Sequence, residues 1–170
     1  MEKRVIVVLG LLVSMFFVRS FHIVGGEIEF ITVQPGVYLI NLIQYKDEAQ
    51  QENQGYDPTV TVYVFSNSDN SRVLIQDLPL ITVTDVEYSI AECSIDELQT
   101  SRILYSARVN LDPKEYNDPK GYYIAWERCC RNGRIANIIN PTGTGMKYVL
   151  EIPPLWKDDK PFINSSPVLN

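Results

Sequence analysis

The chain has 170 residues, of which 45% are hydrophobic and 21% are charged. This length suffices for one folded domain with its own core, and the apolar fraction excludes an intrinsically disordered chain. The formal net charge of −6 disfavours a nucleic-acid partner, because an acidic surface repels a phosphate backbone.

Residues 1–20 have the pattern of a secretory signal peptide. Lys3 and Arg4 form a positive start, and Val5–Val18 is a run of fourteen uncharged, mostly apolar residues. A membrane span needs about 20 apolar residues, so this run is too short to act as an anchor. We predict cleavage after Ser20, a secreted or cell-surface protein without an integral membrane span, and an environment in which disulfides form.

Short apolar segments separated by turn residues follow, and we predict that residues 21–154 form one β-domain. Gln34-Pro35-Gly36 is a tight turn between a strand at residues 27–33 and its hairpin partner at 37–45. Residues 101–111 show the alternation of a strand with one buried and one wet face. Similar apolar runs predict further strands at residues 59–65, 72–75, 81–90, 121–132 and 146–152.

About eight such strands at roughly 8–15-residue spacing, without a convincing helix, predict an all-β fold. The class that we expect is an antiparallel Greek-key β-sandwich of the immunoglobulin-like kind. Residues 155–170 contain lone prolines and no strand period, which predicts a linker toward a following domain.

The side-chain inventory offers little catalytic chemistry. Ile23-Val24-Gly25-Gly26 matches the mature N-terminus of trypsin-like proteases, but the single histidine, His22, stands directly before this string. A Ser-His-Asp triad needs a histidine held deep in a cleft, and a zinc site needs about four Cys or His ligands at paired spacing. We therefore predict a non-catalytic protein without catalytic residues or a metal site. We keep as an alternative an enzyme whose only catalytic groups are the carboxylates of Asp and Glu.

Calcium is the only cofactor that the sequence leaves open. Four aspartates, none with the DxDxDG spacing of a dedicated loop, lie in or near predicted turns: Asp69, Asp85, Asp112 and Asp118. A solvated acidic surface that keeps a secreted protein soluble is the commoner reason for such residues, so we expect no cofactor.

Three cysteines leave one unpaired. Cys129 and Cys130 are adjacent, and neighbours on an extended strand point to opposite faces, so both cannot face the core. We predict that Cys93 bonds either Cys129 or Cys130, which would stabilise the fold by about 3–4 kcal/mol. A bond between the adjacent pair would be strained.

Aromatic side chains provide an alternative to a purely structural role. Tyr and Trp rings stack on sugars while their polar ends bond hydroxyl groups. Tyr122, Tyr123 and Trp156 are the candidates for facing a surface glycan. Trp126 lies in the middle of a predicted strand, so we expect it in the core.

Several segments resemble the N-terminal region of large cell-surface proteins of gliding bacteria that leave the cell by type IX secretion. The segments are His22–Ile28, Tyr45-Lys46-Asp47, Gly121–Tyr123, Trp126–Asn132, Ile135–Ile138 and Asn164–Pro167. The resemblance implies an adhesin-like or structural surface protein, with further β-domains of the same polypeptide if the chain is a fragment. Most members of that family lack a defined ligand, so the resemblance implies location and architecture rather than mechanism. We take a surface glycan or protein as the partner to test.

The chain departs from that family in its cysteines. The family has one directly after the Tyr-Arg-Asp element, where this chain has Glu48, and another in the region near Thr100. Both are missing, so the disulfides of the family cannot be carried over in full. The C-terminal sorting domain of the family is also not part of this sequence.

Overall fold

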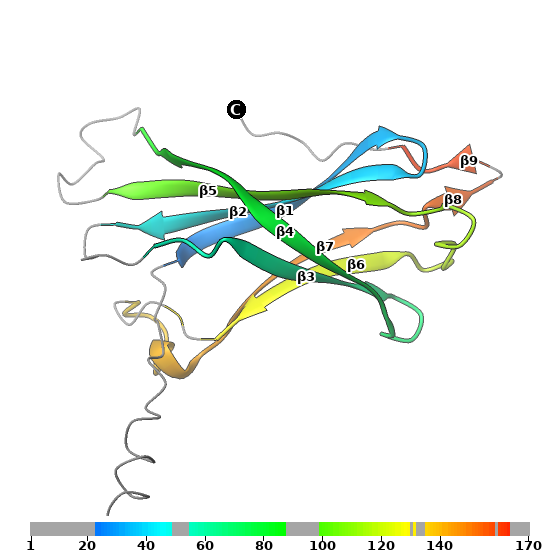
Figure 1. Ribbon diagram of the computed structural model, residues 1–170. Coiled ribbons are helices and arrows are strands. Elements are labelled where there is room, and N and C mark those ends of the chain that lie inside the picture. The colour runs from blue at the N-terminus through cyan, green and yellow to red at the C-terminus, as the bar shows by residue number, and fades with distance from the viewer. Residues whose placement is uncertain are drawn as a thin grey trace, which may run out of the picture.

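The computed structural model describes residues 23–48, 55–87, 99–129, 131, 135–158 and 160–163. Within them the all-β prediction is confirmed, with a seven-stranded antiparallel sheet and a separate two-stranded one (Figure 1). The strands are β1 (Ile23–Gln34), β2 (Val37–Asp47), β3 (Thr59–Ser66), β4 (Arg72–Asp85), β5 (Thr100–Asn110), β6 (Tyr122–Arg128), β7 (Met146–Ile152), β8 (Trp156–Lys157) and β9 (Lys160–Pro161).

The large sheet folds over on itself. Its strand order is β1-β2-β5-β4-β3-β6-β7, and the long strand β4 belongs to both halves. Residues of β4 up to Pro79 pair with β3, and those from Leu80 onward pair with β5. The half formed by β1, β2 and β5 therefore faces the half formed by β3, β6 and β7 (Figure 1).

The two outer strands of the sheet, β1 and β7, approach each other and make the fold nearly barrel-like. Gly26 of β1 lies so close to Tyr148 of β7 that a Cβ at this position would be 2.7 Å from a ring carbon. The same Cβ would be 2.6 Å from the backbone carbonyl oxygen of Ile43 on β2, so this close packing requires glycine.

One strand replaces the two that the sequence predicted at residues 72–75 and 81–90. Pro79 has no N–H to donate, and it lies where β4 leaves β3. The next N–H, that of Leu80, donates to the carbonyl of Pro58 at 2.9 Å, and an irregularity follows between Leu80 and Thr82. The proline therefore marks a change of pairing partner rather than the end of a strand.

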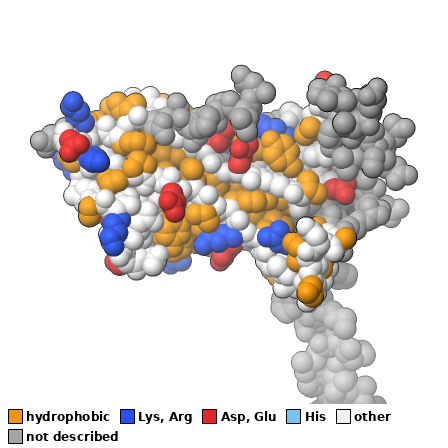
Figure 2. Space-filling model, turned by 180° about the vertical axis from the view of Figure 1, so that it is seen from behind, with side chains coloured by type: hydrophobic (Ala, Val, Ile, Leu, Met, Phe, Trp, Pro, Cys, Tyr) orange, Lys and Arg blue, Asp and Glu red, His pale blue; other side chains and the backbone are white. Residues whose placement is uncertain are grey.

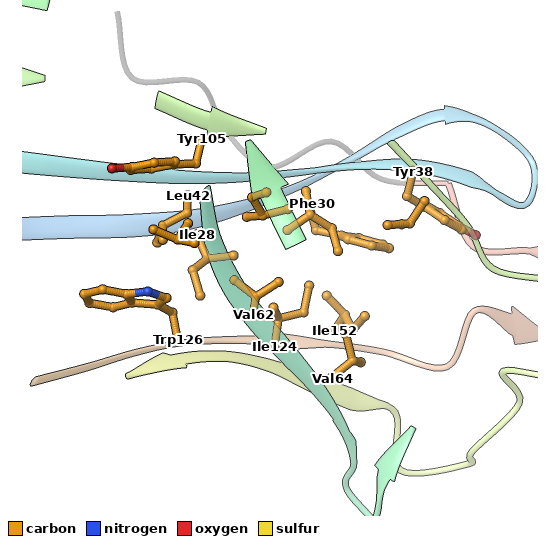
Figure 3. Packing of buried hydrophobic residues seen from close by; sticks show 14 of the residues in the cluster. Ile28, Phe30, Tyr38, Leu42, Val62, Val64, Tyr105, Ile124, Trp126 and Ile152 are labelled. Carbon is orange, nitrogen blue, oxygen red and sulfur yellow. The ribbon is translucent and has the colours of Figure 1, made fainter. Parts of the chain in front are cut away.

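The hydrophobic core lies between the two halves of the sheet (Figure 3). Alternate side chains of β2 and β3 point inward, as their period of two predicts. Trp126 is 3% exposed, which confirms its prediction as a core residue. Phe30 and Tyr38 stack at 4.5 Å between ring centroids at the other end of the core.

The folded part extends beyond residue 154, where the sequence placed its boundary. Leu155 is fully buried in the core, and the N–H of Phe162 donates to the Leu155 carbonyl at 2.9 Å. Strands β8 and β9 pair between these two residues. The predicted linker is therefore wrong for residues 155–162, because apolar side chains at both ends of this segment pack against the core.

No helix in the described ranges is long and apolar enough to cross a membrane. The only helix there is the single 3-10 turn η2 (Pro141–Gly143). The predicted signal peptide at residues 1–20 and the residues after 163 lie outside the described part of the chain.

Candidate functional site

Tyr122, one of the three aromatic residues predicted to face a ligand, lies in the core instead. It is 4% exposed, and its ring packs against Tyr116 with 5.8 Å between centroids. Its hydroxyl oxygen accepts a hydrogen bond of 2.8 Å from the N–H of Asp118, and burial raises its pKa. The side chain ties the loop before β6 to the core, so the prediction that Tyr122 faces a ligand is wrong.

Tyr123 is half-buried on the outer face of the large sheet. It belongs to a row of five side chains, here called the aromatic ladder, which consists of Arg72, Tyr63, Phe65, Tyr123 and Lys147. Its ring stacks on Phe65 at 5.0 Å, and Phe65 lies 6.4 Å from Tyr63. The Lys147 Nζ is 5.6 Å from the centroid of Tyr123, and the Arg72 guanidinium is 5.7 Å from that of Tyr63. Neighbouring rings or cations thus lie against the ring faces, and a sugar would meet mainly their edges and hydroxyl groups.

Tyr63 and Phe65 were not predicted to lie on the outer face of the sheet. The signal was present, because Val62 and Val64 alternate with them along β3. Since the valines are buried, the two aromatic rings must lie on the opposite face.

Trp156 lies on β8, away from the aromatic ladder's strands. It is half-buried, and the Nζ of Lys114 lies 5.9 Å from its ring centroid. Trp126, in contrast, stacks on Tyr148 inside the fold at 5.2 Å. Among the described ring contacts, none joins Trp156 to Tyr123, so the predicted aromatic residues do not form one site.

Cys129 is exposed, directly after the end of β6, and it is disulfide-bonded. Its partner, Cys93 or Cys130, lies outside the described residues. The predicted pairing of Cys93 with either Cys129 or Cys130 therefore stays a prediction.

The calcium candidate Asp118 is already committed to hydrogen bonds. Its carboxylate accepts from the hydroxyl groups of Ser66 and Ser68 and from the N–H of Lys120 at 2.8 Å. The Ser66 hydroxyl leads the hydrogen bonds that hold the pKa of Asp118 far below its usual range. Asp69 has a lowered pKa too, caused first by its hydrogen bond with Ser71.

These aspartates act as turn residues. Asp112 likewise accepts from the N–H of Lys114 at 2.9 Å. Within the part of the chain that the structure describes, no three Asp, Glu, Cys or His side chains gather closely enough to hold a metal ion. Oxygens that already accept several N–H and O–H groups are poorly available to Ca²⁺.

A cluster of polar side chains that the sequence did not predict lies at the end of β2. Lys46 is 0% exposed, its Nζ is 3.3 Å from the Glu48 carboxylate, and it lies 4.5 Å from the ring centroid of Tyr56. Tyr56 donates its hydroxyl proton to Glu48 at 2.8 Å. Nearby in sequence, Gln44 is 2% exposed, and its Nε2 has no hydrogen-bond partner among the described residues.

An ion pair joins β6 to the loop before β3. Arg128 donates to the carboxylate of Asp57, with both side chains partly exposed. The pair lies near Tyr105, whose pKa is raised to about 12, first by burial and second by the negative charge of Asp57. These groups hold the loop against the core rather than presenting a reactive side chain.

A hollow lined mainly by cationic side chains lies on the described surface and is here called the basic hollow. It lies where β6 ends and β7 begins and has a volume of about 620 Å³. Three of its side chains are cationic and one is a carboxylate. The residues that line it are Glu127, Arg128, Cys129, Arg131, Gly145, Met146 and Lys147.

Elsewhere the charges are mixed. The face seen in Figure 2 carries hydrophobic side chains with Lys, Arg, Asp and Glu scattered between them. No extended field of one sign covers this face among its described residues, so the basic hollow is a local feature.

No protein-family model, curated protein or solved structure matches this chain. The resemblance to surface proteins of gliding bacteria therefore rests on the sequence segments alone.

Proposed function

We propose that this chain is a non-catalytic structural or adhesive module of a secreted bacterial cell-surface protein, with further β-domains of the same polypeptide as neighbours. The strand order of the large sheet carries this proposal. Its halves, β1-β2-β5-β4 and β3-β6-β7, correspond to the ABED and CFG sheets of constant-type immunoglobulin domains, an architecture common on cell surfaces. Fold does not by itself imply function, so the predicted signal peptide is the second support.

The contact of Tyr122 also supports an immunoglobulin-like Greek-key sandwich. In such domains a tyrosine near the start of strand F bonds the backbone a few residues upstream. Tyr122 begins β6, which takes the place of strand F, and bonds the N–H of Asp118. Antibody domains carry their core tryptophan on strand C, whereas Trp126 of this chain is on β6.

The test combines export with adhesion. We expect a bacterial host to release a chain that begins at Phe21, as N-terminal sequencing would show. Beads coated with the purified protein should adhere to bacterial envelopes more strongly than albumin-coated beads. An uncleaved chain retained inside the cell would contradict the proposal. So would a hydrolytic activity that a single carboxylate substitution abolishes.

A second candidate function is binding of a surface glycan. It is favoured by the aromatic ladder and the adjoining basic hollow, which share Lys147. Together they place aromatic edges, hydroxyl groups and the ammonium group of Lys147 next to one another. Such a mixture suits a polar ligand with apolar faces.

A further inference from the structure

Two cations of the basic hollow, Arg131 and Lys147, make no ion pair with the described residues, and Arg131 is the one whose position is fixed by hydrogen bonds. Arg131 donates its Nε–H to the Gly145 carbonyl at 2.9 Å, and its backbone N–H bonds the carbonyls of Pro141 and Thr144. These bonds fix the base of the side chain. Its two terminal amino groups make no hydrogen bond or ion pair with the described residues. A guanidinium held in this way presents paired N–H donors, which match the two oxygens of a carboxylate.

The neighbouring charges favour an anion as well. Lys147 is exposed at the start of β7, and Arg128 adds a guanidinium that is shared with Asp57. Positive groups gather here although the whole chain has a net charge of −6. Local potential rather than net charge decides what enters a hollow.

The rest of the lining distinguishes a sugar from a simple anion. Glu127 is exposed and pairs in register with Lys147, so it offers a hydrogen-bond acceptor beside the cations. A carboxylate in this place repels a ligand that carries only negative charge, but it can accept hydroxyl protons.

We propose that the basic hollow binds an acidic saccharide of the uronic acid class, with the sugar carboxylate on Arg131 and sugar hydroxyls on Glu127. This inference rests on glycan binding, the second candidate function. In this inference, Arg131 rather than the aromatic side chains makes the main contact with the glycan. The hollow's volume of about 620 Å³ is within the range of small-ligand sites, about 300–1,000 Å³.

The test is calorimetric titration of the purified protein with an oligogalacturonate. Neutral dextran oligosaccharide and poly-glutamate serve as comparison ligands. We expect the uronate oligomer to bind and the other two not to bind, with affinity falling as salt is raised. Arg131→Gln should weaken uronate binding at least tenfold, and Arg131→Lys should weaken it less, because it keeps the charge but loses the paired donors.

The matched control is Arg108→Gln, which removes an exposed cation of β5 outside both the basic hollow and the aromatic ladder, and it should leave uronate affinity unchanged. Equal affinity of Arg131→Gln and the unaltered protein would overturn the proposal, as would equal losses for both variants. Poly-glutamate binding as tight as uronate binding would assign the hollow to acidic peptides instead. Beads that adhere to envelopes without any uronate binding would refute this inference alone and leave the structural or adhesive function standing.

Discussion

Lys46 is fully buried at the end of β2, where Glu48 and the ring of Tyr56 replace the water that its ammonium group would have in solution. Removing a charge from water costs several kcal/mol unless such partners are present. At the same end of the sheet, Gln44 keeps an amide nitrogen buried without a partner among the described residues. At this end of the sheet, the partners of Lys46 therefore stabilise the folded state, whereas the unpaired amide of Gln44 destabilises it.

Replacing Glu48 by Gln tests the ion pair. The change removes the carboxylate beside Lys46 while keeping an acceptor for Tyr56, so the free energy of unfolding should fall by about 2 kcal/mol. Urea unfolding measures the change. The double variant Lys46→Met/Glu48→Gln should regain most of the loss. A double variant as unstable as the single one would show that the charge pair is not the cause.

Replacing Gln44 by Met tests the unpaired amide. The substitution keeps the side-chain length and removes the buried donor, so we expect a gain of about 1 kcal/mol in the free energy of unfolding. Gln76→Met is the matched control, because Gln76 bonds the Asp77 carbonyl on a more exposed part of β4. A loss of stability in the Gln44 variant would mean that its amide has a partner outside the described residues.

The cysteine pairing is settled by mass spectrometry of peptides prepared without reduction. We expect a peptide that links Cys93 to the Cys129-Cys130 segment, with one thiol left to react with an alkylating reagent. Detection of three alkylated thiols would contradict the predicted disulfide.

At the scale of elements, the short β8–β9 hairpin closes one end of the core. Leu155 before it is fully buried, and Tyr38 donates to the carbonyl of Phe162 after it at 3.5 Å. Leu155→Ala should therefore lower the free energy of unfolding by about 2–5 kcal/mol, as measured by urea unfolding. The control is Ile163→Ala, which should change it little, since Ile163 is 68% exposed. Equal losses of unfolding free energy in the two variants would show that residues 155–162 do not stabilise the folded domain and form a linker, as the sequence predicted.

The end of β2 lies beside the start of β5, where the predicted family resemblance would lead us to expect two cysteines that this chain does not have. The N–H of Glu48 donates to the carbonyl of Gln99 at 2.7 Å, so position 48 lies beside the region near Thr100. Cysteines at these places would be neighbours, and their absence together leaves neither without its partner.

At the scale of the whole molecule, the ionisation of buried tyrosines limits the stability of the fold at high pH. Burial raises the pKa of each, most clearly of Tyr105, to about 12. The folded state holds these protons more tightly, so their contribution is full below about pH 10, the unfolded pKa, and is lost as the pH rises through about 12. The other tyrosines with raised pKa are Tyr38, Tyr56, Tyr116, Tyr122 and Tyr148.

We therefore expect the free energy of unfolding to decrease between pH 10 and 12, with about 2 kcal/mol of the decrease due to Tyr105. Urea unfolding across this range measures it, and Tyr105→Phe should give a shallower decline. A Tyr105→Phe protein with an unchanged slope would show that Tyr105 does not titrate in this way.

Local side-chain patterns sufficed to predict most strands, because alternation and turn residues act over a few positions. Residues 37–45, 59–65 and 146–152 lie in strands as expected, and Trp126 is in the core. The merging of two predicted segments into β4 was not predictable from the sequence. A proline usually ends a strand, and Pro79 is tolerated because it lies where β4 changes its pairing partner from β3 to β5.

The sequence by itself determined that this chain is built from antiparallel strands around an apolar core, because the period of side chains along a strand is a local property. Only the tertiary structure decided which side chains meet. Tyr122 is buried with its hydroxyl bonded to Asp118, and Lys46 is buried because Glu48 and Tyr56 surround it. Arg131 borders a hollow because the end of β6 lies beside the start of β7. Each depends on contacts between segments whose approach no local pattern encodes.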